Sequence, residues 1–149
     1  VAYERLSAGM KRLLDGLNAV HSAKYAYTSQ SAEEKYAGKT AITYRRSESV
    51  YDEVTHPVVR THPVTGKKAL YVNPMFTIRF EDMSEEESKP LLNYLFEHCV
   101  RPEFGCRVNW DPNMVTMWDN RCVQHYAVDD YQAHERLLYR VTVNGDKPV

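Results

Sequence analysis

The sequence predicts a mainly β fold with flanking helices, and two kinds of pattern support this prediction. Two hairpin patterns, over residues 58–72 and 114–143, combine alternating apolar and polar residues with turn-forming residues between the two arms. Two other stretches, Tyr3 to His21 and Glu85 to Cys99, repeat apolar residues with the 3.6-residue period of an amphipathic helix. We therefore expect two helices packed against hairpin-forming strands.

Length and composition indicate one globular domain, or part of one. Of the 149 residues, 43% are hydrophobic and 26% are charged, which is ordinary for a globular protein. The net charge of -1 and the scattered basic residues predict neither nucleic acid nor an anionic membrane as a partner. No apolar run is long enough to span a bilayer, and no signal peptide is recognisable. Cys99, Cys106 and Cys122 lack zinc-site spacing, so we expect free thiols in a reducing, cytoplasmic setting.

The two helices differ in how clearly their ends are marked. The first stripe begins without a Ser, Thr, Asp or Asn cap, whereas Ser84 and Glu87 form a capping box for the second helix. Pro90 lies past the first turn of this second helix. It should either kink the helix or place its true start near Lys89.

The region between the helices begins with a weak signal and continues into a hairpin. We interpret residues 22–54 as a mobile insertion or lid, because small polar residues and tyrosines follow no period there. Pro63 and Gly66 then mark a turn between two short strands. The His-Pro pairs at His56 and His62 resemble metal ligands at first sight, but a turn role fits the stiffening prolines better.

The C-terminal part alternates in the manner of strands. We expect strands at Phe104 to Trp110, Met114 to Tyr126 and Glu135 to Val143, the last two forming a hairpin. Arg136 and Arg140 then share one face, while the opposite, apolar face packs on neighbouring structure. Two guanidinium forks on one face suit two anionic groups, although simple exposure to solvent is the alternative.

At this point the residues carry a resemblance to a known family. The segment WDNRCVQHYAVDDY, followed by ERLLYRVTVNGDKP, resembles the C-terminal signature of the taurine dioxygenase family. The similarity continues upstream through HPVVRTHPVTGKKALYVNPMFTIRF and SEEESKPLLNYLFEH to the first helix, so it covers nearly the whole chain. This resemblance implies a partial double-stranded β-helix, the jelly roll of cupin-like proteins.

The resemblance also implies roles for single residues and two cofactors. His125 matches the distant histidine of the facial triad that binds iron(II), the metal cofactor. Arg136 matches the arginine that pairs with the far carboxylate of 2-oxoglutarate, the co-substrate. Arg140 matches the residue that binds the acidic group of the primary substrate, and Phe76 and Tyr27 fall near positions that line the substrate. Activity would require an imidazole nitrogen of His125 that is free of a proton.

The chain departs from the family pattern in one important respect. None of its six histidines belongs to a His-x-Asp or His-x-Glu pair, so two of the three metal ligands are missing. We therefore expect the chain to be the C-terminal half of a longer enzyme, inactive by itself. Trp118 and Asp119 are expected to shape the turn before the metal-binding strand and to support His125.

Two functions remain open at this stage. The first is an iron(II)- and 2-oxoglutarate-dependent dioxygenase that uses O2 to hydroxylate a small acidic substrate, such as taurine or another sulfonate, and releases succinate and CO2. The alternative is a non-catalytic relative that serves as a binding or assembly module. A homo-oligomer is expected as the assembly in the first case.

Overall fold

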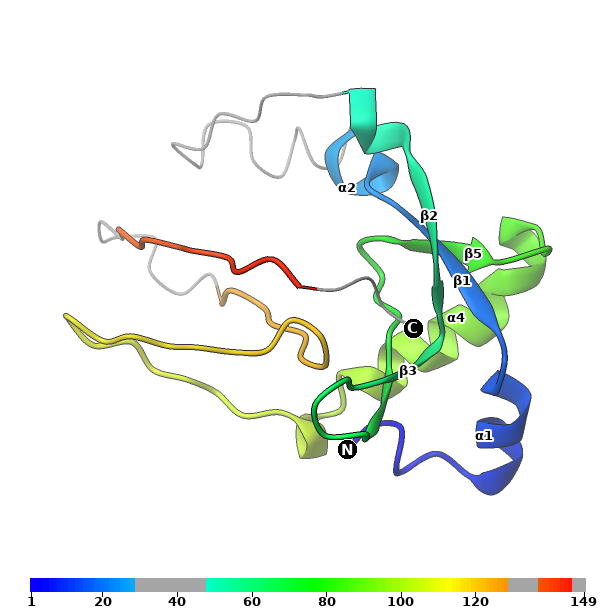
Figure 1. Ribbon diagram of the computed structural model, residues 1–149, viewed down its shortest axis with the longest axis horizontal. Coiled ribbons are helices and arrows are strands. Elements are labelled where there is room, and N and C mark those ends of the chain that lie inside the picture. The colour runs from blue at the N-terminus through cyan, green and yellow to red at the C-terminus, as the bar shows by residue number, and fades with distance from the viewer. Residues whose placement is uncertain (29–47, 129–136, 146–149) are drawn as a thin grey trace.

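The computed structural model describes residues 1–28, 48–128 and 137–145, with the side chains of residues 27 and 28 excepted. The helical elements are α1 (Ala8–Leu14), α2 (Lys24–Thr28), η1 (Glu48–Tyr51), α4 (Glu85–Cys99) and η2 (Pro102–Phe104). The strands are β1 (Asn18–Ser22), β2 (Glu53–Pro57), β3 (Val59–Thr61), β4 (Lys68–Leu70) and β5 (Thr77–Phe80). Figure 1 shows α4 beside the strands, and the C-terminal segments extending away from both.

The strands form two antiparallel sheets. In the larger sheet β1 lies between β2 and β5, and Ala19 is opposite both His56 and Phe80. A bulge interrupts the β1–β5 pairing between Val20 and His21. The smaller sheet pairs β3 with β4. It begins directly after β2, so the two sheets are joined by a single residue, Val58.

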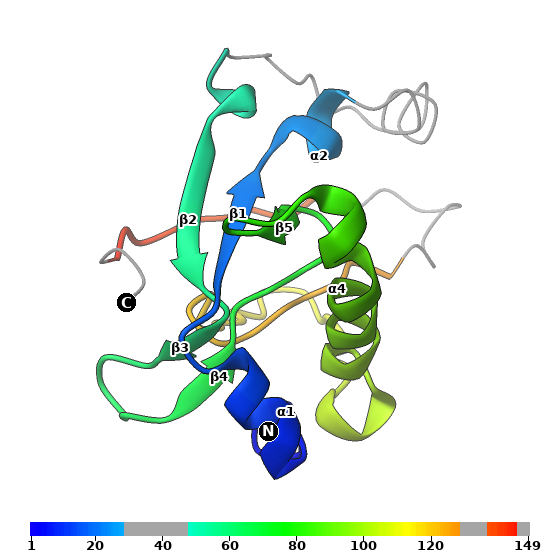
Figure 2. The ribbon, with the colours of Figure 1, turned by 90° about the vertical axis from the view of Figure 1, so that its right-hand side faces the viewer.

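The hydrophobic core lies where α1, the sheets and α4 meet. Figure 2 shows α4 running along the β5 side of the larger sheet, with α1 next to the β3–β4 hairpin. Eight buried apolar side chains form the core: Leu6, Leu14, Ala19, Val58, Val72, Phe80, Leu92 and Leu95. Burying such side chains is the main source of stability in a fold of this size.

The predicted long first helix is wrong in its extent. Helix α1 covers only Ala8–Leu14, and the chain continues into β1. Gly16 has a φ of 79°, a left-handed conformation that ends a helix and that glycine adopts without strain. The predicted absence of a cap is also wrong, because the Ser7 side chain accepts a hydrogen bond from the Met10 N–H.

The second predicted helix is confirmed at both ends. Helix α4 begins after the Ser84 capping box, in which the Ser84 hydroxyl and the Glu87 carboxylate each bond the other residue's backbone N–H. The helix continues through Pro90, so the alternative start near Lys89 is wrong. Ser88 is fully buried, accepts a bond from the Phe80 N–H and donates one to the Ser84 carbonyl. This serine joins the end of β5 to the first turn of α4.

The central hairpin is confirmed as well. Strands β3 and β4 flank the turn predicted at Pro63 and Gly66, and Gly66 has a φ of 67°. The turn role of His62 is also confirmed, since its ring accepts hydrogen bonds from two backbone N–H groups of that turn. The centre of the predicted lid, residues 29–47, lies outside the described residues, and α2 and η1 flank it.

The predicted C-terminal strands are not found. Residues 105–128 and 137–145 contain no strand, and Phe104 ends the helix η2. Alternation predicts an extended shape, but a strand also needs a neighbour to accept its backbone hydrogen bonds. No such neighbour lies alongside these segments in the part of the chain that the structure describes. A turn separates the first two of these segments, where the Met114 N–H bonds the Asp111 carbonyl and Asn113 has a positive φ.

The expectation that the apolar face of the last segment is packed is also wrong. Tyr139, Val141 and Val143 are each about nine-tenths exposed. The same missing neighbour explains this exposure, because side chains on one face of an extended segment are covered only when another layer lies over them. Among the described residues no helix is both long and apolar enough to cross a bilayer, and the three cysteines are unpaired.

Candidate active site

His125 lies on an exposed part of the C-terminal segment. Its ring contacts the indole of Trp118, with ring centroids 4.7 Å apart and the planes tilted by 47°. No hydrogen bond or ion pair to His125 is seen among residues 1–28, 48–128 and 137–145. The imidazole nitrogens are therefore not committed to another described side chain.

The other predicted site residues are less fully described. Arg140 is exposed and Phe76 is half-buried in the turn before β5. Arg136 and the side chain of Tyr27 lie outside the described residues, although the backbone of Tyr27 belongs to α2. No hydrogen bond, ion pair or ring contact joins His125, Arg140 and Phe76 to one another within the described ranges.

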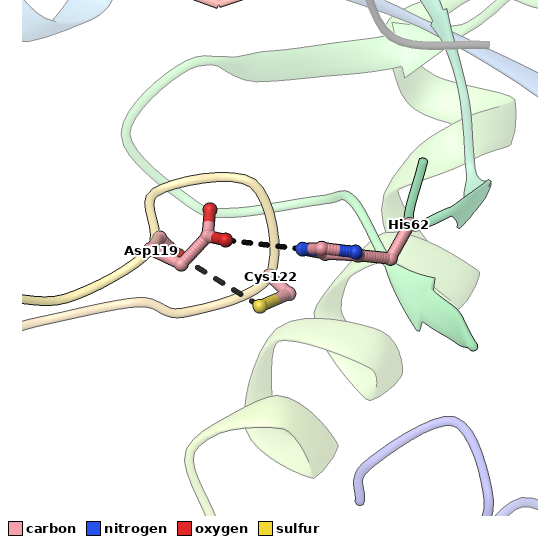
Figure 3. Close-up of side chains that lie close together, drawn as sticks. All are labelled: His62, Asp119 and Cys122. Carbon is pink, nitrogen blue, oxygen red and sulfur yellow. Dashed lines mark hydrogen bonds and ion pairs between the residues drawn. The ribbon is translucent and has the colours of Figure 1, made fainter. Parts of the chain in front are cut away.

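A different group of chemically active side chains lies at the turn that precedes His125. Figure 3 shows His62 from the β3–β4 hairpin facing Asp119 and Cys122 on that turn. The His62 Nε2 atom is 3.0 Å from the Asp119 carboxylate. The Cys122 thiol points to the Asp119 backbone carbonyl at 3.8 Å. The sequence predicts separate local roles for His62 and Asp119, and no sequence pattern pairs them.

Both carboxylate oxygens of Asp119 accept several hydrogen bonds. The Arg121 guanidinium donates to both carboxylate oxygens, the closest contact being 2.7 Å, and the Arg121 N–H donates a further bond at 2.9 Å. These bonds to Arg121, followed by the bond from His62, hold the pKa of the Asp119 carboxyl well below its usual range. The carboxylate is therefore ionised at neutral pH.

His62, Asp119 and Cys122 are close enough together to bind a metal ion, since one ligand atom from each lies within 4.8 Å of the others. The hydrogen bonds argue against that use. The Arg121 guanidinium already occupies the carboxylate, and its positive charge would repel a cation placed beside it. We therefore interpret this cluster as structural.

A second histidine cluster is formed by His21 of β1, His56 of β2 and Tyr71, and His21 is its buried member. His21 is only 6% exposed, and its ring lies 5.3 Å from His56 and 5.8 Å from Tyr71, measured between ring centroids. Burial, and then the proximity of His56, lowers the pKa of His21 to about 4. The only hydrogen-bond partner of the His21 ring in the described structure is the Thr77 hydroxyl, 3.3 Å from Nδ1.

Two surface hollows lie among the described residues, and neither is lined by a predicted site residue. One hollow of about 390 Å³ lies between β5 and α4 and is lined in part by Glu85, Glu86 and Lys89. It contains none of the predicted site residues. Two carboxylates on its wall would disfavour an acidic ligand, so we do not place substrate binding there.

Comparison with known proteins gives the family. The profile described as "Taurine catabolism dioxygenase TauD, TfdA family" matches residues 1–142. An alpha-ketoglutarate-dependent sulfate ester dioxygenase of Pseudomonas putida is 39% identical over 148 residues, which cover 99% of this chain and 48% of that protein. An alpha-ketoglutarate-dependent sulfonate dioxygenase of Saccharomyces cerevisiae is 33% identical, with coverage of 99% and 34%.

Solved structures agree with these relatives. A taurine dioxygenase from Burkholderia xenovorans superimposes with a TM-score of 0.54 and 34% identity, covering 74% of this chain and 31% of that one. The structure of AAD-2 in complex with Mn(II) and N-oxalylglycine gives a TM-score of 0.56 and 27% identity, covering 74% and 40%. The predicted jelly-roll fold is thus confirmed, although the described strands do not close a barrel. The chain spans half or less of the length of these relatives, and it belongs to the TauD/TfdA family of alpha-ketoglutarate-dependent dioxygenases.

Proposed function

We propose that this chain is the C-terminal part of an iron(II)- and 2-oxoglutarate-dependent dioxygenase that hydroxylates a small acidic substrate, a sulfonate or a sulfate ester. The observation that carries the proposal is the agreement between the relatives' activities and the spacing of His125, Arg136 and Arg140. When bound, iron(II) and 2-oxoglutarate supply the oxidising chemistry that hydroxylates a C–H bond and releases succinate and CO2.

The residues present fit one third of an iron site. His125 offers an imidazole without a competing hydrogen bond among the described residues, and Trp118 packs against its ring. A facial triad needs one further histidine and one carboxylate. The proposal therefore assigns those two ligands to polypeptide outside these 149 residues, in agreement with the fraction of the relatives that the chain covers.

The exposed apolar side chains support this division of the fold. Val115 and Met117, two residues apart, are 87% and 91% exposed, and Tyr139 and Val141 are similarly open. Alternate residues of an extended segment point to one face, so each pair presents an apolar face without a covering layer. In the proposed enzyme the remaining part of the barrel covers these faces.

The two arginines have separate roles in this proposal. Arg136 binds the far carboxylate of 2-oxoglutarate, and Arg140 binds the sulfonate or sulfate group of the primary substrate, each through its planar fork of donors. Holding both acids fixes the distance between the co-substrate and the C–H bond to be oxidised. Phe76 and Tyr27 contribute apolar contacts to the substrate in this proposal.

The proposal is tested by activity of the full-length protein. With iron(II) and 2-oxoglutarate, succinate release should rise on addition of taurine, an alkyl sulfate or an aryloxy acid, and the responding compound identifies the substrate class. Succinate release that requires neither iron nor 2-oxoglutarate, or no release with any acid, contradicts the proposal and favours a binding module.

Single substitutions then separate the roles. Arg136→Ala should raise the 2-oxoglutarate concentration for half-maximal activity roughly tenfold to a thousandfold, because the charged partner proposed for the 2-oxoglutarate carboxylate is lost at a cost of about 2 to 4 kcal/mol. Arg140→Ala should impair the primary substrate while sparing uncoupled 2-oxoglutarate turnover. Arg12→Ala, which removes an exposed arginine from α1, serves as the matched control. Equal loss of both activities in the Arg140 variant would contradict its role.

A further inference from the structure

The hairpin turn fixes the tautomer of the His62 ring. His62 is 8% exposed, and its Nδ1 atom lies 3.2 Å from the backbone nitrogens of both Val64 and Thr65. An atom that accepts from two N–H donors carries no proton itself. The proton of the neutral ring is therefore on Nε2, which donates it to the Asp119 carboxylate 3.0 Å away.

This bond ties two segments that are far apart in the sequence. Asp119 lies at the start of a turn whose backbone is closed by bonds from the Cys122 and Val123 N–H groups to the Asp119 carbonyl. The same carboxylate accepts the Arg121 N–H at 2.9 Å. The turn is thus folded around Asp119 by its own hydrogen bonds. His62 then attaches this turn to the β3–β4 hairpin.

A second anchor lies at the other end of the same segment. The Gln124 side chain donates to the Val72 carbonyl at 2.8 Å, just beyond β4. Val72 is buried in the core, so this acceptor is fixed in place. Gln124 directly precedes His125, and Trp118, whose ring lies against His125, directly precedes Asp119. Trp118 and His125 therefore flank the anchored segment, each one residue away from an anchor.

We propose that His62 and Gln124 are positioning residues, which fix the turn of residues 118–125 on the β3–β4 hairpin and so hold the His125 ring ready to bind the metal. The inference rests on the proposed function for the role of His125. The energetic reason is that a ligand held in place beforehand loses little conformational entropy when the metal binds. Neither residue touches the metal in this scheme.

The first test measures the anchoring itself and needs no metal. Hydrogen exchange of the full-length protein is followed at the Arg121, Cys122 and Val123 amides, whose bonds close the turn. His62→Ala and Gln124→Ala should each accelerate their exchange at least tenfold. His98→Ala is the matched control, because His98 is equally buried and also bonds through Nε2, but to the Ala2 carbonyl. Unchanged exchange in His62→Ala, or equal acceleration in His98→Ala, overturns the inference.

The second test measures the consequence for the metal. Co(II) is titrated into the full-length protein, and His62→Ala should weaken its binding tenfold or more while leaving the KM for the primary substrate within about twofold. His62→Gln retains a donor toward Asp119 and should restore part of the affinity. If His125→Ala abolishes Co(II) binding but His62→Ala leaves it unchanged, the positioning role is overturned alone. If His125→Ala has no effect, the proposed function fails together with the positioning role.

Discussion

The buried histidine of β1 should make the stability of this protein fall as the pH becomes acidic. His21 is 6% exposed, lies beside His56 and Tyr71, and has a pKa of about 4 in the folded chain against 6.5 for a free histidine. Between these two values the unfolded chain binds more protons than the folded chain, so stability is complete above pH 6.5 and is lost as the pH falls toward 4.

The size of the effect follows from the difference between the two pKa values. Each unit of pKa difference corresponds to about 1.36 kcal/mol, so the full loss is about 3 kcal/mol, most of which falls between pH 7.5 and pH 4.5. This is a large part of the stability of a typical small domain, about 5 to 15 kcal/mol. Replacing His21 by Gln, which retains a polar group but cannot gain a proton, should remove this part of the pH dependence.

Urea unfolding, followed by far-ultraviolet circular dichroism at pH 7.5, 6 and 4.5, measures the free energy of unfolding of wild type and His21→Gln. The wild-type free energy of unfolding should decrease more between pH 7.5 and pH 4.5 than that of His21→Gln, by about 2 to 3 kcal/mol. Val20→Ala is the control, because it removes buried volume from the next position of β1 without a titratable group and should lower stability equally at each pH. Parallel pH profiles for wild type and His21→Gln would refute the reasoning from burial.

The remaining predictions concern stability at neutral pH and are measured by the same urea titration. Leu95→Ala should cost about 2 to 5 kcal/mol because Leu95 is fully buried in the core, whereas Leu13→Ala, at a position 54% exposed, should cost far less. Ser84→Ala should lower stability by about 1 kcal/mol through loss of the capping box, and an unchanged midpoint would show that this cap is dispensable. Gly16→Ala should destabilise by about 1 kcal/mol because of the positive φ at that position, while Gly9→Ala within α1 should be neutral or stabilising.

The elements that were predicted correctly are those whose signals are local. The capping box at Ser84 and Glu87 lies within one helical turn, and it defines the start of α4 despite Pro90. The β3–β4 hairpin is likewise specified by a short turn around Gly66. Local signals suffice in these cases because the hydrogen bonds that form each element join residues close in sequence.

The incorrect predictions involve partners that are distant in sequence. Leu17 and Val20 continue the periodicity of α1, but the left-handed Gly16 separates them from the helix, and Val20 is buried in a strand instead. The extended segments after η2 alternate apolar and polar residues as a strand does, yet no neighbouring strand pairs with them among the described residues. Periodicity reports which side chains can share a face, but it does not report whether the backbone finds a partner.

The candidate site shows the same limit. The resemblance to the family named His125 and its two arginines, but only the folded chain brings His62 to Asp119, across 57 positions of sequence. The available signal was that His62 and Asp119 both lie within the segments that carry the resemblance. Such a signal marks both as important without showing that they meet.

The fully buried Ser88 has a mechanical consequence for the molecule. Its hydroxyl accepts a bond from the last residue of β5 and donates one to the capping residue of α4, at 2.9 and 2.8 Å. Pivoting the helix relative to the sheet would break the bond from the Phe80 N–H and leave that N–H and the buried Ser88 hydroxyl with one partner fewer, a costly change. This buried bond favours movement of α4 together with β5, so we expect any hinge that admits or releases a ligand to lie elsewhere in the chain.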